Sequence, residues 1–231
     1  MSICRHRNGY NFSKPFRQRY STISSTVNTA SEVAKQLLQI KAIKLSPQKP
    51  FTWASGILSP IYCDNRITLS FPEVRKLIKE GLVEKSIDFG SFDAVSGVAT
   101  AGIAHGLMLA EALQKPFSYV RSKPKGHGRQ NLIEGHIEKG SKVLVVEDLI
   151  STGGSSLAAV EALRAQGVEV VGVLAVFSYN FPKAANAFKA ANCPLETLSN
   201  YDVLIREALA SKYINLIDVD LLTTWRSKVG E

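Results

Sequence analysis

Residues 142–156 read K-V-L-V-V-E-D-L-I-S-T-G-G-S-S, and this stretch decides the fold class. The apolar, β-branched run over 142–146 is typical of a strand buried in a parallel sheet. Two adjacent carboxylates, Glu147 and Asp148, follow it, and a turn of hydroxyl residues and glycines then opens a helix expected over 155–165. A strand, a turn and a helix in this order predict an α/β protein.

The flanking segments repeat this alternation. Further strands are expected over 92–98, 117–121 and 168–177. Helices are expected over 102–114 and, after capping-box patterns, from Thr29 to about Leu45 and from Ser70 onward. Between the last two, residues 51–66 mix aromatics with Gly and Pro, as short strands and turns do. The pattern predicts a parallel sheet with helices on both faces.

The chain has 231 residues and a net charge of +8, but this charge is uneven. The first 31 residues contain no acid and hold five cations: Arg5, Arg7, Lys14, Arg17 and Arg19. We therefore expect residues 1–28 to be a basic, flexible extension and residues 29–231 to be the folded domain. The extension also fits an organellar transit peptide, with a plain tail or a misassigned start as alternatives. The expected location is the cytoplasm, or an organelle if residues 1–28 are a targeting signal.

Composition excludes several classes of protein. The longest uncharged stretch, 94–110, contains Ser, Thr, His and glycines, so no membrane span is expected. The three cysteines are far apart and show no metal-ligand spacing, which argues against a disulfide framework or a zinc site. His105 lies in an apolar helical segment and is expected to be a core residue with satisfied hydrogen bonds.

The turn after the acidic pair predicts a phosphate site. Gly153 and Gly154 permit close backbone approach, and the N–H groups at the start of the next helix, at Ser155 and Ser156, suit a phosphate monoester. The two acids can accept hydrogen bonds from vicinal ribose hydroxyls, with Ser151 and Thr152 as donors. The alternative is that the acids only end a strand and the glycines form an ordinary turn. Residues 97–102 lack the lysine of a P-loop.

A second cluster lies in Y-V-R-S-K-P-K-G-H-G-R-Q, residues 119–130. It combines glycines and a histidine with four cations: Arg121, Lys123, Lys125 and Arg129. Such a loop is expected to be mobile when empty and to close over a multiply charged anion, such as a departing pyrophosphate. A solvated basic loop is the alternative. Nucleic-acid binding is disfavoured, because aromatic residues do not alternate with the basic ones.

Four segments together resemble the orotate phosphoribosyltransferases of the type I phosphoribosyltransferase family. They are F-T-W-A-S-G-I-L-S-P-I-Y-C-D-N-R (51–66), V-A-T-A-G-I-A-H (98–105), Y-V-R-S-K-P-K-G-H-G (119–128) and V-V-E-D-L-I-S-T-G-G-S-S (145–156). The resemblance implies a parallel sheet with helices on both faces and a small N-terminal hood. It further implies transfer of ribose 5-phosphate from phosphoribosyl pyrophosphate (PRPP) to orotate by a homodimer with shared sites. Magnesium is implied as an ion carried by PRPP, with no metal site built by the protein.

The resemblance also implies roles for individual residues. Catalytic roles are expected for Lys125, His127, Glu147 and Asp148. PRPP binding is expected for Arg121, Lys125, His127, Glu147, Asp148, Leu149, Ile150, Ser151, Thr152, Gly153, Gly154 and Ser155, and for the turn Thr100, Ala101 and Gly102. Orotate binding is expected for Ser151, Arg66, Tyr62 and Ser55, although an ion pair between Arg66 and Asp64 is the alternative for that arginine. Ala54 and Ile57 stand where many relatives carry basic residues, which removes a potential contact.

Two other functions remain open at this point. A transferase for a different base shares the PRPP segment, and a regulator could keep the PRPP site while binding nucleic acid through its basic extension. An appended decarboxylase is not expected, since a barrel domain needs about 250 further residues.

Overall fold

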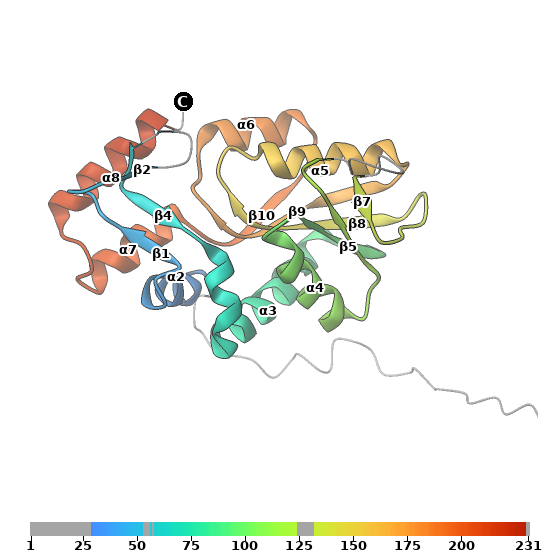
Figure 1. Cartoon of the computed structure of the whole chain (residues 1–231), viewed down its shortest axis with the longest axis horizontal. Coiled ribbons are helices and arrows are strands. Elements are labelled where there is room, and N and C mark those ends of the chain that lie inside the picture. Colours follow the sequence, from blue (N-terminus) through green and yellow to red (C-terminus); the bar gives the residue numbers. More distant parts are fainter. Residues whose placement is uncertain (1–28, 53–55, 57, 124–131, 230–231) are drawn as a thin grey trace, which may run out of the picture.

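A six-stranded sheet forms the centre of the protein (Figure 1). The computed structural model describes residues 29–52, 56, 58–123 and 132–229. The strand order is β10-β9-β8-β5-β6-β7, and every neighbouring pair is parallel except β6 with β7. The strands are β5 (Ala94–Val98), β6 (Phe117–Val120), β7 (Ile133–Glu134), β8 (Lys142–Ile150), β9 (Glu169–Ser178) and β10 (Leu195–Asn200). The expected parallel sheet is confirmed.

Helices cover both faces of this sheet, as expected (Figure 1). One apolar cluster joins the sheet to α2 (Thr29–Gln39), α3 (Pro72–Ser86), α4 (Gly102–Leu113) and α7 (Tyr201–Ala210). A second cluster joins the opposite face to α5 (Gly154–Ala165) and α6 (Pro182–Ala190). Alternate residues of β8 serve the two clusters: Leu144 and Val146 belong to the first, Val143 and Val145 to the second. A strand that is buried on both faces therefore reads as a continuous apolar run.

The hood is built from both ends of the described chain. Its N-terminal part pairs β1 (Ile43–Leu45) with β4 (Ile61–Cys63) and β2 (Phe51–Thr52) with β3 (Leu58–Ser59), followed by the 3-10 helix η1 (Asn65–Ser70). The C-terminal helix α8 (Leu216–Val229) packs onto it, because Trp225 Nε1 donates to the carbonyl oxygen of Leu58 at 3.0 Å. The expected small N-terminal hood is thus joined by the C-terminal helix.

Two expected helix boundaries are wrong. The helix from Thr29 ends at Gln39, and residues 43–45 form β1, whose Ile43 and Leu45 side chains are buried. Strand pairing with β4 overrides the helical spacing there. Ser70 does not cap α3, because Pro72 occupies the first helical position and Phe71 precedes it. Proline suits that position, since it has no N–H to satisfy.

Strand β8 is longer than the sequence suggested. It continues through the acids to Ile150 and pairs with β9 as far as Ser178, whereas β5 ends at Val98 and pairs with β8 only up to Val146. Beyond Val146, β8 therefore has a strand neighbour on one side only. The acids lie in the strand itself, at the point where β5 leaves room beside it.

A short 3-10 helix, η2 (Ile87–Phe89), links α3 to the strand β5. No helix among the described residues is long and apolar enough to cross a lipid bilayer.

Candidate active site

The predicted site lies where the strand order reverses. After β5 the chain passes to β6 on one side and later returns to β8 on the other. Helices α4 and α5 therefore begin at the carboxyl ends of the neighbouring strands β5 and β8, on opposite faces of the sheet. Open α/β sheets bind ligands at such a reversal. Neither helix has a side-chain cap at its N-terminus, so first-turn N–H groups of both point toward this edge. Two uncapped N-termini suit a ligand with two phosphate centres.

Glu147 is almost fully buried, with 4% of its surface exposed. Its Oε2 accepts hydrogen bonds from Ser155 Oγ (3.3 Å) and Ser156 Oγ (3.1 Å), and its Oε1 accepts from the backbone N–H of Asp148 (3.1 Å). Asp148 itself is only half-buried. Of the two acids, Asp148 is therefore placed to meet a ligand directly, while Glu147 connects β8 to the first turn of α5.

Burial favours the protonated forms of the adjacent acids Glu147 and Asp148. Burial, followed by the adjacent Asp148 carboxylate, raises the pKa of Glu147 to about 8. Burial also raises the pKa of Asp148. Two carboxylates this close do not both ionise easily, so the pair holds a proton near neutral pH. A cationic or hydrogen-bonding ligand would displace that proton.

We expect Glu147→Gln to remove part of the pH dependence of stability. The folded-state pKa of about 8 lies above the ordinary value of 4.5, so the folded protein keeps a proton that the unfolded chain releases between these values. The free energy of unfolding of the wild type should therefore fall as the pH rises through this window. Glutamine does not ionise, so the variant should gain stability relative to wild type from about pH 5 to about pH 8. Denaturant titrations at several pH values measure this gain. A difference in unfolding free energy between variant and wild type that does not change with pH contradicts the raised pKa of Glu147.

The turn after β8 depends on Gly153. Its φ of +83° lies in the left-handed region, and a Cβ there would lie 2.7 Å from Phe188 Cε2. Thr152, Gly154 and Ser155 are exposed around it. Two details differ from expectation: Ser156 is fully buried with its hydroxyl bonded to Glu147, and the Ile150 side chain lies in the core. The main chain of Ile150 is also engaged, because its carbonyl oxygen accepts from the N–H of Tyr179.

The second turn, residues 100–102, contacts the first acid closely. Thr100 is exposed, and the Ala99–Thr100 peptide bond is cis. Gly102 is packed against β8, because a Cβ there would lie 2.6 Å from the carbonyl oxygen of Val146 and 3.2 Å from Glu147 Oε1. This close packing places the turn at residues 100–102 against the strand that leads into the turn at Gly153.

His105 is a core residue, but it is not satisfied as expected. It lies on the buried face of α4, and both ring nitrogens lack a hydrogen-bond partner among the described residues. Burial lowers the pKa of His105 to about 4, so the ring is neutral at physiological pH.

The residues expected near orotate lie on the hood beside β8. Tyr62 is 38% exposed on β4, and Arg66 is exposed at the start of η1. Arg66 forms the alternative ion pair, with Nε 2.6 Å from Asp64 Oδ1 and Nη2 2.9 Å from Asp64 Oδ2. This pairing lowers the pKa of Asp64 and keeps Arg66 charged. Its orotate contact remains a prediction.

The basic segment starts and ends at the same edge. Arg121 directly follows β6 and is half-exposed. Its Nη1 lies 3.4 Å from Oε1 of Glu134 on β7. Val120 at the end of β6 pairs with Ile133 at the start of β7, so the chain leaves and re-enters the sheet at the same edge. Lys125 and His127, and also Ser55 in the hood, lie outside the described residues. Among the described residues, no three His, Cys, Asp or Glu side chains are grouped as a metal site.

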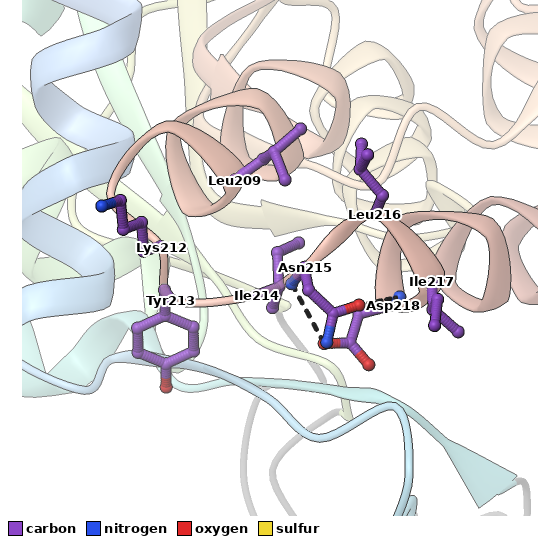
Figure 2. Close-up of a pocket in the computed structure, with 8 residues that line it drawn as sticks. All are labelled: Leu209, Lys212, Tyr213, Ile214, Asn215, Leu216, Ile217 and Asp218. Atoms are coloured by element: carbon purple, nitrogen blue, oxygen red, sulfur yellow. Dashed lines mark hydrogen bonds between the residues drawn. The ribbon is translucent and has the colours of Figure 1, made fainter.

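One surface cavity lies far from this edge in the fold. It has a volume of about 640 Å³ and is formed by the end of α7 and the start of α8 (Figure 2). Two of its polar side chains are already engaged, because Asp218 Oδ2 accepts from the Asn215 N–H and Asn215 Oδ1 accepts from the Asp218 N–H. Lys212 is the one cation among its lining residues. This cavity is poorly suited to a diphosphate.

Sequence reasoning missed one buried residue of the site. Asn65 is fully buried, and its Nδ2 donates to the carbonyl oxygen of Asp148 at 2.7 Å. The partners are 83 residues apart, so no local pattern marks the contact. The role of Ser156 as a Glu147 donor was also missed, although its position three residues after Gly153 places it in the first turn of the helix.

Comparisons with known proteins agree with this site. A family model described as the phosphoribosyl transferase domain matches residues 66–209, more than half of the chain. The orotate phosphoribosyltransferase of Cytophaga hutchinsonii is 53% identical over 206 residues, covering 89% of this chain and 99% of the relative.

Two solved structures share the architecture. The orotate phosphoribosyltransferase of Aeropyrum pernix aligns with a TM-score of 0.68 and 31% identity, covering 76% of this chain and 97% of that one. The Mycobacterium tuberculosis orotate phosphoribosyltransferase in complex with PRPP aligns with a TM-score of 0.61 and 26% identity, covering 76% and 98%.

Proposed function

We propose roles for individual residues from the premise that this chain belongs to the orotate phosphoribosyltransferase family and has the type I phosphoribosyltransferase fold. Its reaction transfers ribose 5-phosphate from PRPP to orotate, which releases pyrophosphate and gives orotidine 5′-monophosphate in pyrimidine biosynthesis. One observation supports the roles best. The carboxylate of Asp148, the turn at Gly153 and the uncapped starts of α4 and α5 share one edge of the sheet.

The donor is proposed to bind across the two turns. Residues 151–155 and the N-terminus of α5 hold the 5′-phosphate, with Leu149 and Ile150 contributing main-chain groups. Asp148 accepts hydrogen bonds from the ribose hydroxyls, while buried Glu147 fixes Ser155 and the Asp148 N–H. Residues 100–102 at the N-terminus of α4 hold the diphosphate.

The acceptor is proposed to bind between the hood and β8. Tyr62 supplies a partly exposed ring, and Ser151 and Ser55 supply hydroxyls. Arg66 uses Nε and Nη2 for Asp64, so it meets the orotate carboxylate through Nη1 or by exchanging partners. This placement sets a ring nitrogen of orotate opposite the anomeric carbon of the donor.

Departure of pyrophosphate leaves positive charge on the sugar and adds negative charge to the diphosphate. The carboxylate of Asp148 favours the oxocarbenium-like state of the sugar. Arg121, Lys125 and His127 are proposed to stabilise the diphosphate and to exclude water that would hydrolyse the donor. If magnesium binds together with PRPP, it would neutralise part of the diphosphate charge, and the half-buried carboxylate of Asp148 would offer it an oxygen ligand.

The test of this function is consumption of orotate. The full chain, mixed with orotate, PRPP and magnesium, should remove the orotate absorbance and release pyrophosphate. Uracil and purine bases serve as competing acceptors, and they should give little turnover. Unchanged orotate absorbance, or faster consumption of another base, would contradict the proposal.

We propose that the enzyme is a homodimer in which the basic loop of each subunit closes over its partner's site. Inactive Lys125→Ala and inactive Asp148→Asn proteins should then complement each other when refolded together. Random pairing regenerates one intact site in half of the dimers, so roughly a quarter of the wild-type activity should return. If the loop serves its own subunit, no site is intact and mixing restores nothing. Each variant refolded alone is the control.

Residues 29–231 are proposed to form the catalytic domain, because α2 contributes to the apolar cluster and the matched residues 66–209 lie within this range. The enzyme is proposed to act in the cytoplasm, with organelle targeting through residues 1–28 as the alternative. A fusion of residues 1–28 to the N-terminus of a fluorescent protein distinguishes these two locations, because diffuse fluorescence in the cell would reject organelle targeting.

A further inference from the structure

One side chain joins the hood to the acidic pair. Asn65 begins η1 on the hood, and its Nδ2 donates to the main-chain carbonyl oxygen of Asp148 on β8, at 2.7 Å. The side chain is completely buried. A hydrogen bond in such surroundings is costly to break, because the carbonyl oxygen is left without its partner.

The orientation of this amide is fixed by its partners. A carbonyl oxygen can only accept, so the NH₂ end of Asn65 must face Asp148. The opposite end, Oδ1, accepts from the thiol of Cys63 at 3.4 Å. The main-chain oxygen of Asn65 accepts from Thr68 Oγ1 at 2.6 Å, which closes the turn of η1. An aspartate of the same shape has no NH₂ group with which to donate to Asp148.

The hydrogen bond between Asn65 and Asp148 lies between the two substrate-binding parts of the site. Residues 62–66 carry the groups expected to meet orotate, and Asn65 lies among them, directly before Arg66. Asp148, at the other end of the bond, carries the carboxylate expected to meet ribose. The donor side of the site is held independently, because β8 pairs with β9 through Ile150. Asn65 therefore links the orotate side of the hood directly to the backbone of Asp148, whereas the pairing of β8 with β9 does not involve it.

We propose that Asn65 is a positioning residue that holds the orotate-binding face of the hood in register with the ribose-binding carboxylate. This inference rests on the proposed function. A displacement of about 1 Å between reacting groups can cost on the order of a hundredfold in rate. Loss of the bond should therefore affect orotate more than PRPP.

The test compares the Michaelis constants of the two substrates in variants of η1. Asn65→Asp and Asn65→Leu remove the donor and should raise the KM for orotate by about tenfold or more and lower kcat. The KM for PRPP should stay within about twofold, and PRPP should still raise the melting temperature. Asn65→Ser leaves room for a water molecule, so it should raise the KM for orotate by a smaller factor. It replaces the other two variants in the test if they do not fold.

Thr68→Val is the matched control. Thr68 is equally buried in the same turn, and its hydroxyl bonds to Asn65 but not to β8. This variant should lose stability without changing the ratio of the two Michaelis constants. Equal changes in both constants at Asn65, or the same shift in ratio at Thr68, overturn the inference. If the wild type consumes no orotate, the proposed function fails instead, so the two failures are distinguishable.

Discussion

Lys125→Ala is expected to lower kcat by about a hundredfold to a thousandfold, the loss typical of removing one donor to a developing oxyanion, about 2.7–4 kcal/mol. The reason is the charge that gathers on pyrophosphate as its bond to the sugar breaks. The structure places both ends of the basic segment at the edge where α4 and α5 begin, because β6 and β7 pair at Val120 and Ile133. We therefore expect a cation between these two strands to serve the diphosphate.

Steady-state kinetics with saturating orotate and PRPP measure this effect. Lys189→Ala is the control, because Lys189 is an exposed lysine on α6. Both variants should unfold at nearly the wild-type temperature, so a difference in kcat reports on chemistry and not on folding. Wild-type turnover in Lys125→Ala would show that the loop does not serve the leaving group.

The sequence predicts the central part of the fold well because the information there is local. The run from Lys142 to Ser156 contains an apolar strand, an acidic pair and a glycine turn in direct succession. Its strand, turn and helix are present in the structure. Even here, the strand is longer than expected. Charged residues usually end a buried strand, but Glu147 and Asp148 extend β8 beyond the end of β5.

Other parts depend on contacts between distant residues. The helix expected over 29–45 is cut short by the pairing of β1 with β4, nearly twenty residues further on. The elements after Ser178 carried no recognised motif, yet α8 completes the hood through Trp225. Asn65 illustrates the same limit within the site, since its partner is 83 residues away. Local patterns identify ligand-binding turns, but they do not show which side chains hold those turns together.

His105 shows that a buried side chain does not always find hydrogen-bond partners for its polar atoms. Apolar neighbours in the sequence correctly predict a buried ring, but they do not reveal whether its nitrogens find partners. Both nitrogens lack partners among the described residues, so the buried ring adds no hydrogen bond to this part of the core. His105 lies on α4, the helix whose first turn is proposed to bind the diphosphate.

Gly102→Ala is expected to disrupt both the fold near the site and the activity. An alanine Cβ would lie 2.6 Å from the carbonyl oxygen of Val146, closer than packed atoms allow, and 3.2 Å from Glu147 Oε1. The opposing atoms belong to the backbone of a central strand, so they do not move aside easily. Either α4 or β8 must shift, at a cost of about 3 kcal/mol, the upper range for overpacking. For a chain of this size the melting temperature should fall by roughly 6–12 °C.

The activity should fall further than stability alone explains. Any shift that relieves the clash separates the turn at 100–102 from the turn at Gly153, so the two phosphate-binding turns no longer fit one donor. A loss of about a hundredfold in kcat/KM is expected at a temperature where the variant remains folded. Gly154→Ala is the control for stability, because its Cβ meets nothing within 4 Å; it should leave the melting temperature unchanged or slightly raised. A Gly102→Ala protein with wild-type stability and turnover would show that the close packing of α4 on β8 does not hold the site together.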